Sequence, residues 1–357
     1  MKIVSIIGTR PQFIKCAALT RELRTEYNEV IVNTGQHYDF HLSGVFLDQL
    51  NMPKPEYDLG IGSGTHGYQI GQTLIAAEEV LLKEKPDLTL VYGDTNSTLA
   101  GALAASKLHI PLGHIEAGLR CGDRDMPEEI NRTLTDHCSD LLFCPTKSSV
   151  DNLKKENINR GVYLTGDIMV DLLLKQLIIA EKSSVLQDLG LSSKQYLLVT
   201  VHRSSNTDNR QNLKNIVDAL IQMDKTIVFA VHPRTEKALK TYGLYDKLIK
   251  NSKIKVIKPL GYLDFLKLMN HAKKVITDSG GMEKEAYVLK VPCVTLLQAT
   301  AWDVTIEDGW NVLVGSDTEK IINMARNFKP MSGQSEDFGN GEACKNVKNI
   351  IASLFKR

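Results

Sequence analysis

The chain of 357 residues is too long for one ordinary hydrophobic core and fits two domains of about 150 to 200 residues each. Its 43 Lys and Arg balance 42 Asp and Glu, so no basic excess points to a nucleic acid or an anionic membrane as partner. With 43% hydrophobic and 24% charged residues, the composition excludes a largely disordered or collagen-like chain.

The N-terminus and the cysteines favour a cytoplasmic protein. No apolar run approaches the roughly 18 to 20 residues that cross a bilayer, and Met1-Lys2 leads directly into an apolar strand without a signal-peptide pattern. The six cysteines are scattered without a CxxC pair, so we expect buried or idle thiols and no disulfide framework or zinc ribbon. They are Cys16, Cys121, Cys138, Cys144, Cys293 and Cys344.

Short β-branched or leucine-rich runs alternate with longer amphipathic stretches, which is typical of βαβ units and a parallel sheet. In the first half, the pattern predicts strands at 3–7, 30–33, 88–92, 112–115 and 141–144, and helices at 11–27, 67–85 and 97–108. In the second half, it predicts strands at 196–200, 227–230, 255–257, 275–277, 293–296 and 312–314.

These elements predict an α/β protein with two doubly wound, Rossmann-type domains. We place the first domain at 1–166, with its end near Thr165-Gly166-Asp167, and the second at 167–340. The polar stretch 330–341 reads as a surface loop, and we expect 341–357 to form a helix that packs back on the first domain. Ligands of such sheets bind beyond the carboxyl ends of the strands, so the residues that follow each strand are the candidates for function.

The turn after the first strand contains a possible phosphate site. Gly8 allows a tight turn, Pro11 suits the first helical position, and Arg10 and Lys15 supply positive charge near free backbone N–H groups. An ordinary strand-to-helix turn with solvated cations explains the same residues. The segment is not GxGxxG and gives no support for a dinucleotide.

Acidic residues follow later strands and begin the next helix. Asp94 follows strand 88–92, Glu116 follows strand 112–115, and Glu128 and Glu129 come directly after Pro127. Taken singly they read as a helix cap, a loop carboxylate and helix-start acids. Taken together, crowded carboxylates repel, so we expect at least one to hold a proton at neutral pH. An acid and a base in one pocket favour proton-transfer chemistry.

Polar residues also end two strands of the second half. His202 and Arg203 directly follow strand 196–200, and His232 and Arg234 end the next strand in the same way. A histidine in this place is either structural or directed at a ligand, and the sequence leaves both interpretations open. His37 and His41 lie four residues apart, but no HExxH motif accompanies them, so we expect no metal site.

The segment 277–286 combines a strand end with a glycine-rich helix start. Gly280 and Gly281 allow a diphosphate to approach the backbone, Ser279 can cap the helix, and Glu285 can accept both ribose hydroxyls. A plain glycine-rich turn is the alternative.

Taken in order, these segments resemble the non-hydrolysing UDP-N-acetylglucosamine 2-epimerase family. The resemblance implies a GT-B-like pair of domains facing across a cleft, with UDP held mainly by the second domain. It implies inversion at C2 of a UDP-linked 2-acetamido sugar through UDP elimination and re-addition, without metal or nicotinamide cofactor, in a homodimer. The matching segments are GTRPQFIK, TGQHYD, YGDTNSTLAGALAA, HIEAGLR, MPEEINR, LTDH, VHR, HPRT, TDSGGMEKEA, PCVTL, NVLVG and FGNGEA.

The resemblance also assigns roles. It implies that Asp94, Glu116 and Glu128 are acid and base groups and that His202 stabilises the leaving diphosphate. An activating UDP-sugar site in bacterial members would correspond to Gln36, His37, Arg203 and His232. The implied substrate-binding residues are Arg10, Lys15, Arg132, Ser279, Gly280, Gly281 and Glu285.

The chain departs from the family pattern where acids are usual, with Ser205, Ala301 and Val304 in their place. Gln12-Phe13 and Trp302 resemble the branch that acts on UDP-2,3-diacetamido-2,3-dideoxyglucuronate, so two substrates remain open. A GT-B glycosyltransferase and a UDP-sugar-binding protein without catalysis are the rival functions. The leading hypothesis is a cytoplasmic UDP-sugar 2-epimerase that supplies a manno-configured precursor for a surface polysaccharide.

Overall fold

The computed structural model describes residues 1–36 and 52–355. Contacts between residues divide the chain into two compact units, Met1–Leu172 with Glu336–Arg357, and Leu173–Ser335. The sequence analysis placed these boundaries at 166 and 340, whereas the division of the structure passes within the apolar helix α7 (Ile168–Ala180) and before Glu336.

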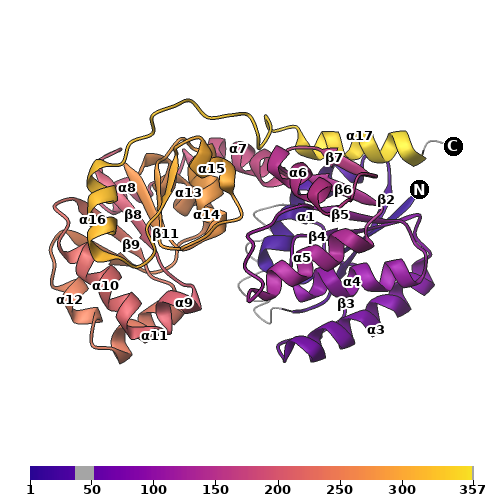
Figure 1. Cartoon of the computed structure of the whole chain (residues 1–357), viewed down its shortest axis with the longest axis horizontal. Helices are drawn as coiled ribbons and strands as arrows, with labels where there is room; N and C mark the ends of the chain where they lie inside the picture. Colours follow the sequence, from indigo (N-terminus) through magenta and orange to yellow (C-terminus); the bar gives the residue numbers. More distant parts are fainter. Residues whose placement is uncertain (37–51, 356–357) are drawn as a thin grey trace. The chain divides into compact units, whose positions relative to one another are not determined.

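The first unit contains a seven-stranded parallel sheet (Figure 1) in the order β3-β2-β1-β4-β5-β6-β7. Its central strands are buried along their whole length, which explains their near-continuous apolar sequences. The strands are β1 (Lys2–Ile7), β2 (Asn28–Asn33), β3 (Tyr57–Asp58), β4 (Leu88–Tyr92), β5 (Leu112–Ile115), β6 (Leu141–Cys144) and β7 (Val162–Leu164).

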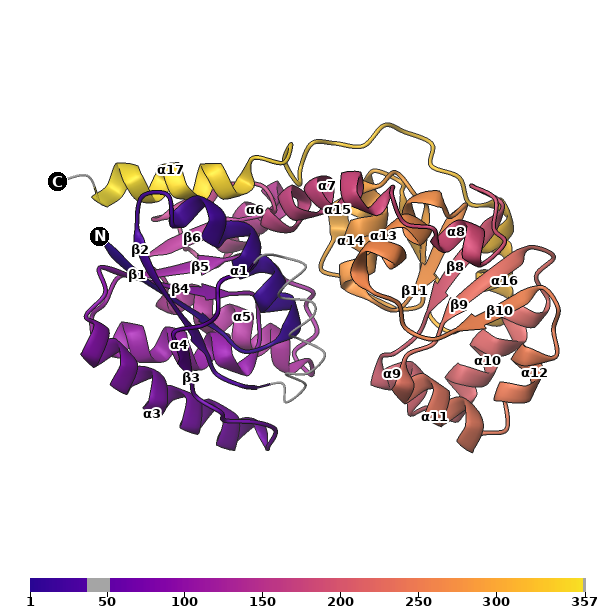
Figure 2. The same cartoon turned by 180° about the vertical axis from the view of Figure 1, so that it is seen from behind.

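Helices cover both faces of this sheet. The helices α3 and α5 both pack against α4 on one face, and α1 lies on the other face. Helix α17 packs on α1 (Figure 2). There Lys348 forms ion pairs with Glu22 and Glu26. The helices of this unit are α1 (Arg10–Leu23), α3 (His66–Glu84), α4 (Asn96–Lys107), α5 (Pro127–Cys138), α6 (Lys147–Lys155) and α17 (Ala343–Phe355).

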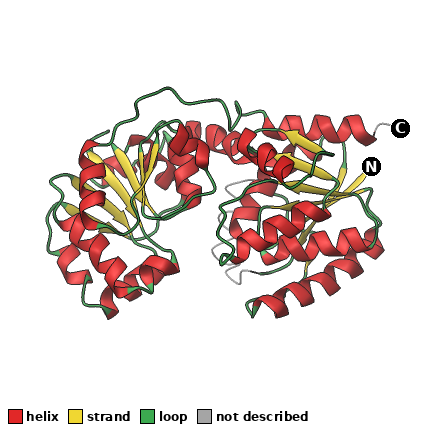
Figure 3. Cartoon of the chain, viewed as in Figure 1, coloured by secondary structure: helices red, strands yellow, loops and turns green. Residues whose placement is uncertain are grey.

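The second unit repeats the architecture with a six-stranded parallel sheet (Figure 3) in the order β10-β9-β8-β11-β12-β13. Separate apolar clusters fill its two faces. The strands are β8 (Tyr196–Thr200), β9 (Thr226–Ala230), β10 (Ile254–Ile257), β11 (Lys274–Thr277), β12 (Cys293–Thr295) and β13 (Asn311–Leu313).

One apolar cluster of this unit lies under α10, α11, α12 and α16, and the other lies under α8, α13 and α14. The helices are α8 (Val185–Asp188), α9 (Ser204–Thr207), α10 (Arg210–Ile221), α11 (Pro233–Thr241), α12 (Tyr245–Ile249), α13 (Tyr262–His271), α14 (Gly280–Val288), α15 (Asp303–Glu307) and α16 (Thr318–Asn327). The prediction of two doubly wound α/β domains is therefore confirmed. None of the helices in the described ranges is long and apolar enough to span a bilayer.

Candidate active site

The turn between β1 and α1 is tied to the end of β4. A side chain at Gly8 would clash with the hydroxyls of Thr34 and Ser97, so only glycine fits there. The Gln12 side chain accepts a hydrogen bond from the Gly8 backbone N–H at 2.8 Å and donates to the Tyr92 carbonyl at 2.7 Å. Gln12 therefore fixes the relative position of two strand ends, a role that the sequence alone did not indicate.

Asp94 lies just beyond β4 and is held by α5. Arg132 donates to its carboxylate from Nη2 at 2.6 Å and from Nε at 3.1 Å, and Asn131 donates to its backbone carbonyl at 3.0 Å. Burial alone would lower the pKa of Arg132, but Asp94 and Glu129 outweigh it and raise that pKa. Arg132 therefore stays charged and keeps the Asp94 carboxylate oriented.

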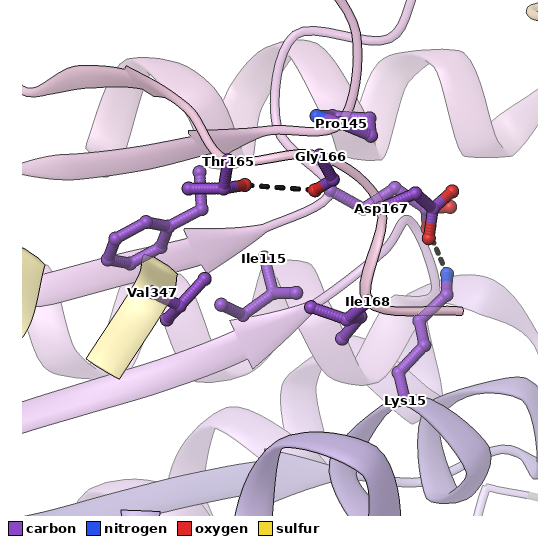
Figure 4. A pocket seen from close by; sticks show the side chains of 10 residues that line it. Lys15, Ile115, Pro145, Thr165, Gly166, Asp167, Ile168 and Val347 are labelled. Carbon is purple, nitrogen blue, oxygen red and sulfur yellow. Dashed lines mark hydrogen bonds and ion pairs between the residues drawn. The ribbon is translucent and has the colours of Figure 1, made fainter. Parts of the chain in front are cut away.

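Glu116 follows β5 and forms an ion pair with Lys15 of α1. Both side chains are nearly buried, and Glu116 adopts a left-handed backbone conformation with φ of 74°. The pair lines a pocket at the carboxyl ends of the strands (Figure 4), with Ile115, Pro145, Thr165 and Ile168 among the other lining residues. The sequence analysis assigned Lys15 to phosphate, and the structure gives it a carboxylate partner in the same unit.

The two acids that begin α5 have different surroundings. Glu128 is exposed, whereas Glu129 is 5% exposed and accepts hydrogen bonds from the backbone N–H groups of Cys121 and Gly122. Burial opposes ionisation of Glu129, but these hydrogen bonds and Arg132 lower its pKa overall. Glu129 thus organises the loop before the helix, and Glu128 is the one directed to solvent.

The acids in this region are not crowded together without compensation. Asp94 has Arg132 beside it, and Glu116 has Lys15. The sequence analysis expected repulsion among the acids to hold a proton on one of them, but each of these two carboxylates has its own cation to offset that repulsion. Carboxylates in such an arrangement can transfer protons, and the cations beside them can bind an anionic substrate.

In the second unit, Asp278 connects the ends of β8 and β11. It is fully buried and accepts backbone hydrogen bonds from His202 at 2.9 Å and from Arg203 at 3.0 Å. Burial lowers the pKa of His202, and Asp278, 3.6 Å from its Nδ1, offsets this only in part. His202 is therefore neutral at pH 7 and can offer a diphosphate a hydrogen bond rather than a full positive charge.

The start of α14 combines a helix N-terminus with polar side chains. Ser279 is the N-cap residue by its backbone angles, but in the described structure its side chain makes no capping hydrogen bond, contrary to the expected capping role. The Arg203 guanidinium and the Trp302 indole lie beside Gly280, and Gly281 is exposed next to it. Such a helix start suits an anion.

Two further substrate-binding candidates have defined positions. Tyr262 donates a hydrogen bond to Glu285 at 3.3 Å, which orients this carboxylate near the start of α14. Arg10 is exposed at the first position of α1.

The residues assigned to an activator site fall into different parts of the chain. Gln36 belongs to the first unit, where its Oε1 accepts hydrogen bonds from Ser97, and His37 lies outside the described residues. Arg203 and His232 belong to the second unit. The exposed His232 accepts a hydrogen bond from the Arg234 N–H, and its ring centroid lies 5.8 Å from that of His202.

Sequence reasoning missed Glu283, which is fully buried on α14. Its Oε2 accepts hydrogen bonds from Thr300 at 2.6 Å and from Asn311 at 3.3 Å. Burial raises its pKa to about 7. A glutamate two residues before Glu285 carries no sequence signal of burial, because its surroundings come from the loop after β12 and from β13.

Comparisons with known proteins identify the family. The family model described as UDP-N-acetylglucosamine 2-epimerase matches residues 21–352. A UDP-N-acetylglucosamine 2-epimerase homolog of Methanococcus maripaludis is 53% identical over 99% of this chain and 100% of its own. The UDP-2,3-diacetamido-2,3-dideoxy-D-glucuronate 2-epimerase of Pseudomonas aeruginosa is 45% identical over 99% of this chain and 100% of its own.

A solved structure is similar over the same extent. The Methanocaldococcus jannaschii UDP-GlcNAc 2-epimerase, crystallised with UDP-GlcNAc and UDP, is 46% identical, with a TM-score of 0.90 over 99% of this chain and 100% of that one. The resemblance that the motifs indicated is therefore confirmed. This chain belongs to the UDP-N-acetylglucosamine 2-epimerase family.

Proposed function

We propose that this protein inverts C2 of a UDP-linked 2-acetamido sugar. A base removes the C2 proton while the C1–O bond to UDP breaks, which leaves UDP and an unsaturated glycal. UDP then adds back to C1 as an acid delivers a proton to the opposite face of C2. The single observation that carries the proposal is the pair of cation-bound carboxylates, Asp94 and Glu116, beyond neighbouring strands of one sheet.

The proposed roles differ between the residues of the two units. Asp94, Glu116 and Glu128 of the first unit act as acid and base groups, with Arg10, Lys15 and Arg132 neutralising phosphate charge. In the second unit, His202 hydrogen-bonds the leaving diphosphate, the start of α14 at Ser279, Gly280 and Gly281 receives it, and Glu285 holds the ribose. Neutral His202 suits this role because one of its ring nitrogens carries a hydrogen that it can donate to a diphosphate oxygen.

The substrate is UDP-N-acetylglucosamine or UDP-2,3-diacetamido-2,3-dideoxyglucuronate. Relatives named for each sugar are similarly close, at 47% and 45% identity. Two positively charged side chains near the start of α14 favour the acidic sugar as second candidate. Lys284 Nζ lies 4.4 Å from the centroid of the Trp302 ring, and Arg203 lies beside the same tryptophan at Gly280. In either case the product is a manno-configured precursor for a surface polysaccharide.

Incubation with each UDP-sugar in D2O tests the proposal. We expect an epimer that carries deuterium at C2 with one or both sugars, seen by proton NMR of the recovered nucleotide sugar. UDP release that depends on an added acceptor would instead indicate a GT-B glycosyltransferase. Binding without exchange would indicate a UDP-sugar-binding protein that lacks catalysis.

We also propose that the protein is a cytoplasmic homodimer. All six cysteines are free thiols, which suits a reducing compartment. Tyr68, Ile75 and Leu82 form an apolar stripe on α3 with exposed fractions of 52%, 53% and 56%, and Ile130 and Leu134 are exposed on α5. Two copies can bury such surfaces together.

Light scattering tests the dimer. The wild-type protein should have twice the mass of one chain, and the Ile75→Lys protein should have the mass of one chain. A monomeric wild type would exclude the dimer.

A further inference from the structure

His114 of β5 is completely buried, and both of its ring nitrogens are engaged. Nδ1 lies 2.6 Å from Asp136 Oδ1, and Nε2 lies 2.7 Å from the carbonyl oxygen of Gly93. A carbonyl oxygen can only accept a hydrogen bond, so Nε2 must carry a hydrogen. The ring is thus held from both sides, by a side chain of α5 and by the backbone after β4.

Asp136 is also bound by donors other than His114. Its Oδ2 accepts a hydrogen bond from Arg120 at 2.7 Å and from the Gly118 backbone N–H at 3.1 Å. Burial raises the pKa of Asp136, but His114 and Arg120 outweigh it and lower that pKa overall. Asp136 is therefore a fixed anchor for one ring nitrogen of His114, while the other ring nitrogen holds the Gly93 carbonyl.

Arg120 links Asp136 to a further carboxylate of the first unit. It makes hydrogen bonds to Glu156 at 2.7 and 2.9 Å. The exposed His137 also contacts Glu156, at 3.1 Å. Buried Cys144 lies near Asp136 and Arg120, and burial raises its pKa, so it stays a neutral thiol. Asp136, which anchors the His114 ring, is therefore itself held by a network that continues to Glu156.

The Gly93 carbonyl that His114 holds lies between the two candidate acids. Gly93 directly precedes Asp94 and has φ of 64°. A methyl group built on it would lie 3.0 Å from Lys15 Nζ and 3.3 Å from Glu116 Oε2. The peptide fixed by His114 therefore connects Asp94 with the Lys15–Glu116 pair, whereas Arg132 and Asn131 hold Asp94 from its other side.

We propose that His114 is a positioning residue that sets Asp94 relative to Glu116 through the Gly93 carbonyl. It does not touch the substrate. The inference rests on the proposed function, because the spacing of these two carboxylates matters only if both serve proton transfer. A displacement of a reacting group by about 1 Å can cost about 100-fold in rate.

Deuterium exchange and UDP binding together test the inference. His114→Gln removes the ring that contacts Asp136 and Gly93 at the same time, and C2 deuterium exchange should fall by about 10- to 100-fold while the Kd for UDP changes less than about twofold. The matched control is His137→Gln, in the same network but exposed, which should retain full exchange.

A folded His114→Gln protein with wild-type exchange would overturn the inference. Equal loss of exchange in the His137→Gln control would also overturn it, since the effect would then belong to the network in general. A wild type that exchanges no hydrogen with either UDP-sugar would overturn the proposed function and the positioning role with it, whereas failure of the positioning role alone would leave wild-type exchange intact.

Discussion

Replacing Glu283 by glutamine should stabilise the second unit at alkaline pH and leave it nearly unchanged at acid pH. The carboxyl group is fully buried, Thr300 and Asn311 donate to Oε2, and Oε1 has no hydrogen-bond partner within the described residues. Burial therefore raises its pKa from an ordinary 4.5 to about 7.

The sign follows from the proton balance. Below pH 4.5 the group is protonated in both the folded and the unfolded chain. As the pH rises towards 7, only the unfolded chain loses the proton, so the free energy of unfolding falls, and above pH 7 the full penalty remains. At about 1.4 kcal/mol per pH unit, the penalty at pH 8 is about 3 kcal/mol.

Glutamine has the shape of the neutral acid and cannot ionise. Urea unfolding followed by tryptophan fluorescence reports on this unit, because both tryptophans, Trp302 and Trp310, belong to it. The free energy of unfolding of the Glu283→Gln protein should exceed that of wild type by about 3 kcal/mol at pH 8 and by less than about 1 kcal/mol at pH 5. The control Glu319→Gln, exposed on α16, should stay within about 0.5 kcal/mol at both values. An equal difference between Glu283→Gln and wild type at pH 5 and pH 8 would refute the reasoning.

Three further predictions concern packing and buried charge. Gly8→Ala should cost about 1 to 3 kcal/mol of unfolding free energy by circular dichroism, because the new methyl group meets Thr34 and Ser97; an unchanged value would contradict the close approach. Lys15→Met should cost about 3 to 5 kcal/mol by leaving Glu116 without its cation, and adding Glu116→Gln should restore part of that loss; a double variant no better than the single one would speak against the pair. Lys274 donates hydrogen bonds to the Met324 and Ala325 carbonyls, and burial lowers its pKa to about 8. Burying its charge therefore lowers the free energy of unfolding below pH 8, and this loss disappears as the pH rises towards 10.5. Relative to Lys274→Met, wild type should therefore gain stability between pH 7.5 and 10 in urea unfolding, and a constant difference would disprove this.

The sequence predicted the buried strands well and missed the two short strands at the edges of the first sheet. The observed bounds of β4, β5, β6 and β8 equal the predicted ones, because strands covered on both faces have continuous apolar sequences. The strands β3 and β7 were missed, since they have two and three residues and are partly exposed, which leaves no periodicity to detect. Helix α7 is apolar on nearly all sides, so its pattern did not indicate where one unit ends and the next begins.

The site shows the same limit. The rule that ligand-binding residues follow parallel strands pointed to Asp94, Glu116 and His202, and all three lie just beyond strand ends in the structure. Their partners depend on contacts between distant segments: Lys15 pairs with Glu116 across 101 positions, and Arg132 with Asp94 across 38. Glu129, not Glu128, turned out to be the buried acid, because the loop at Cys121 and Gly122 folds over it.

The central claim is that the carboxylates of the first unit transfer protons while other residues bind UDP. The most direct test compares C2 deuterium exchange with the Kd for UDP in four variants: Asp94→Asn, Glu128→Gln, Arg10→Ala and Glu285→Gln. The account predicts that the first two abolish exchange and keep UDP affinity, whereas the last two weaken affinity first. An equal loss of UDP affinity in all four proteins would contradict it.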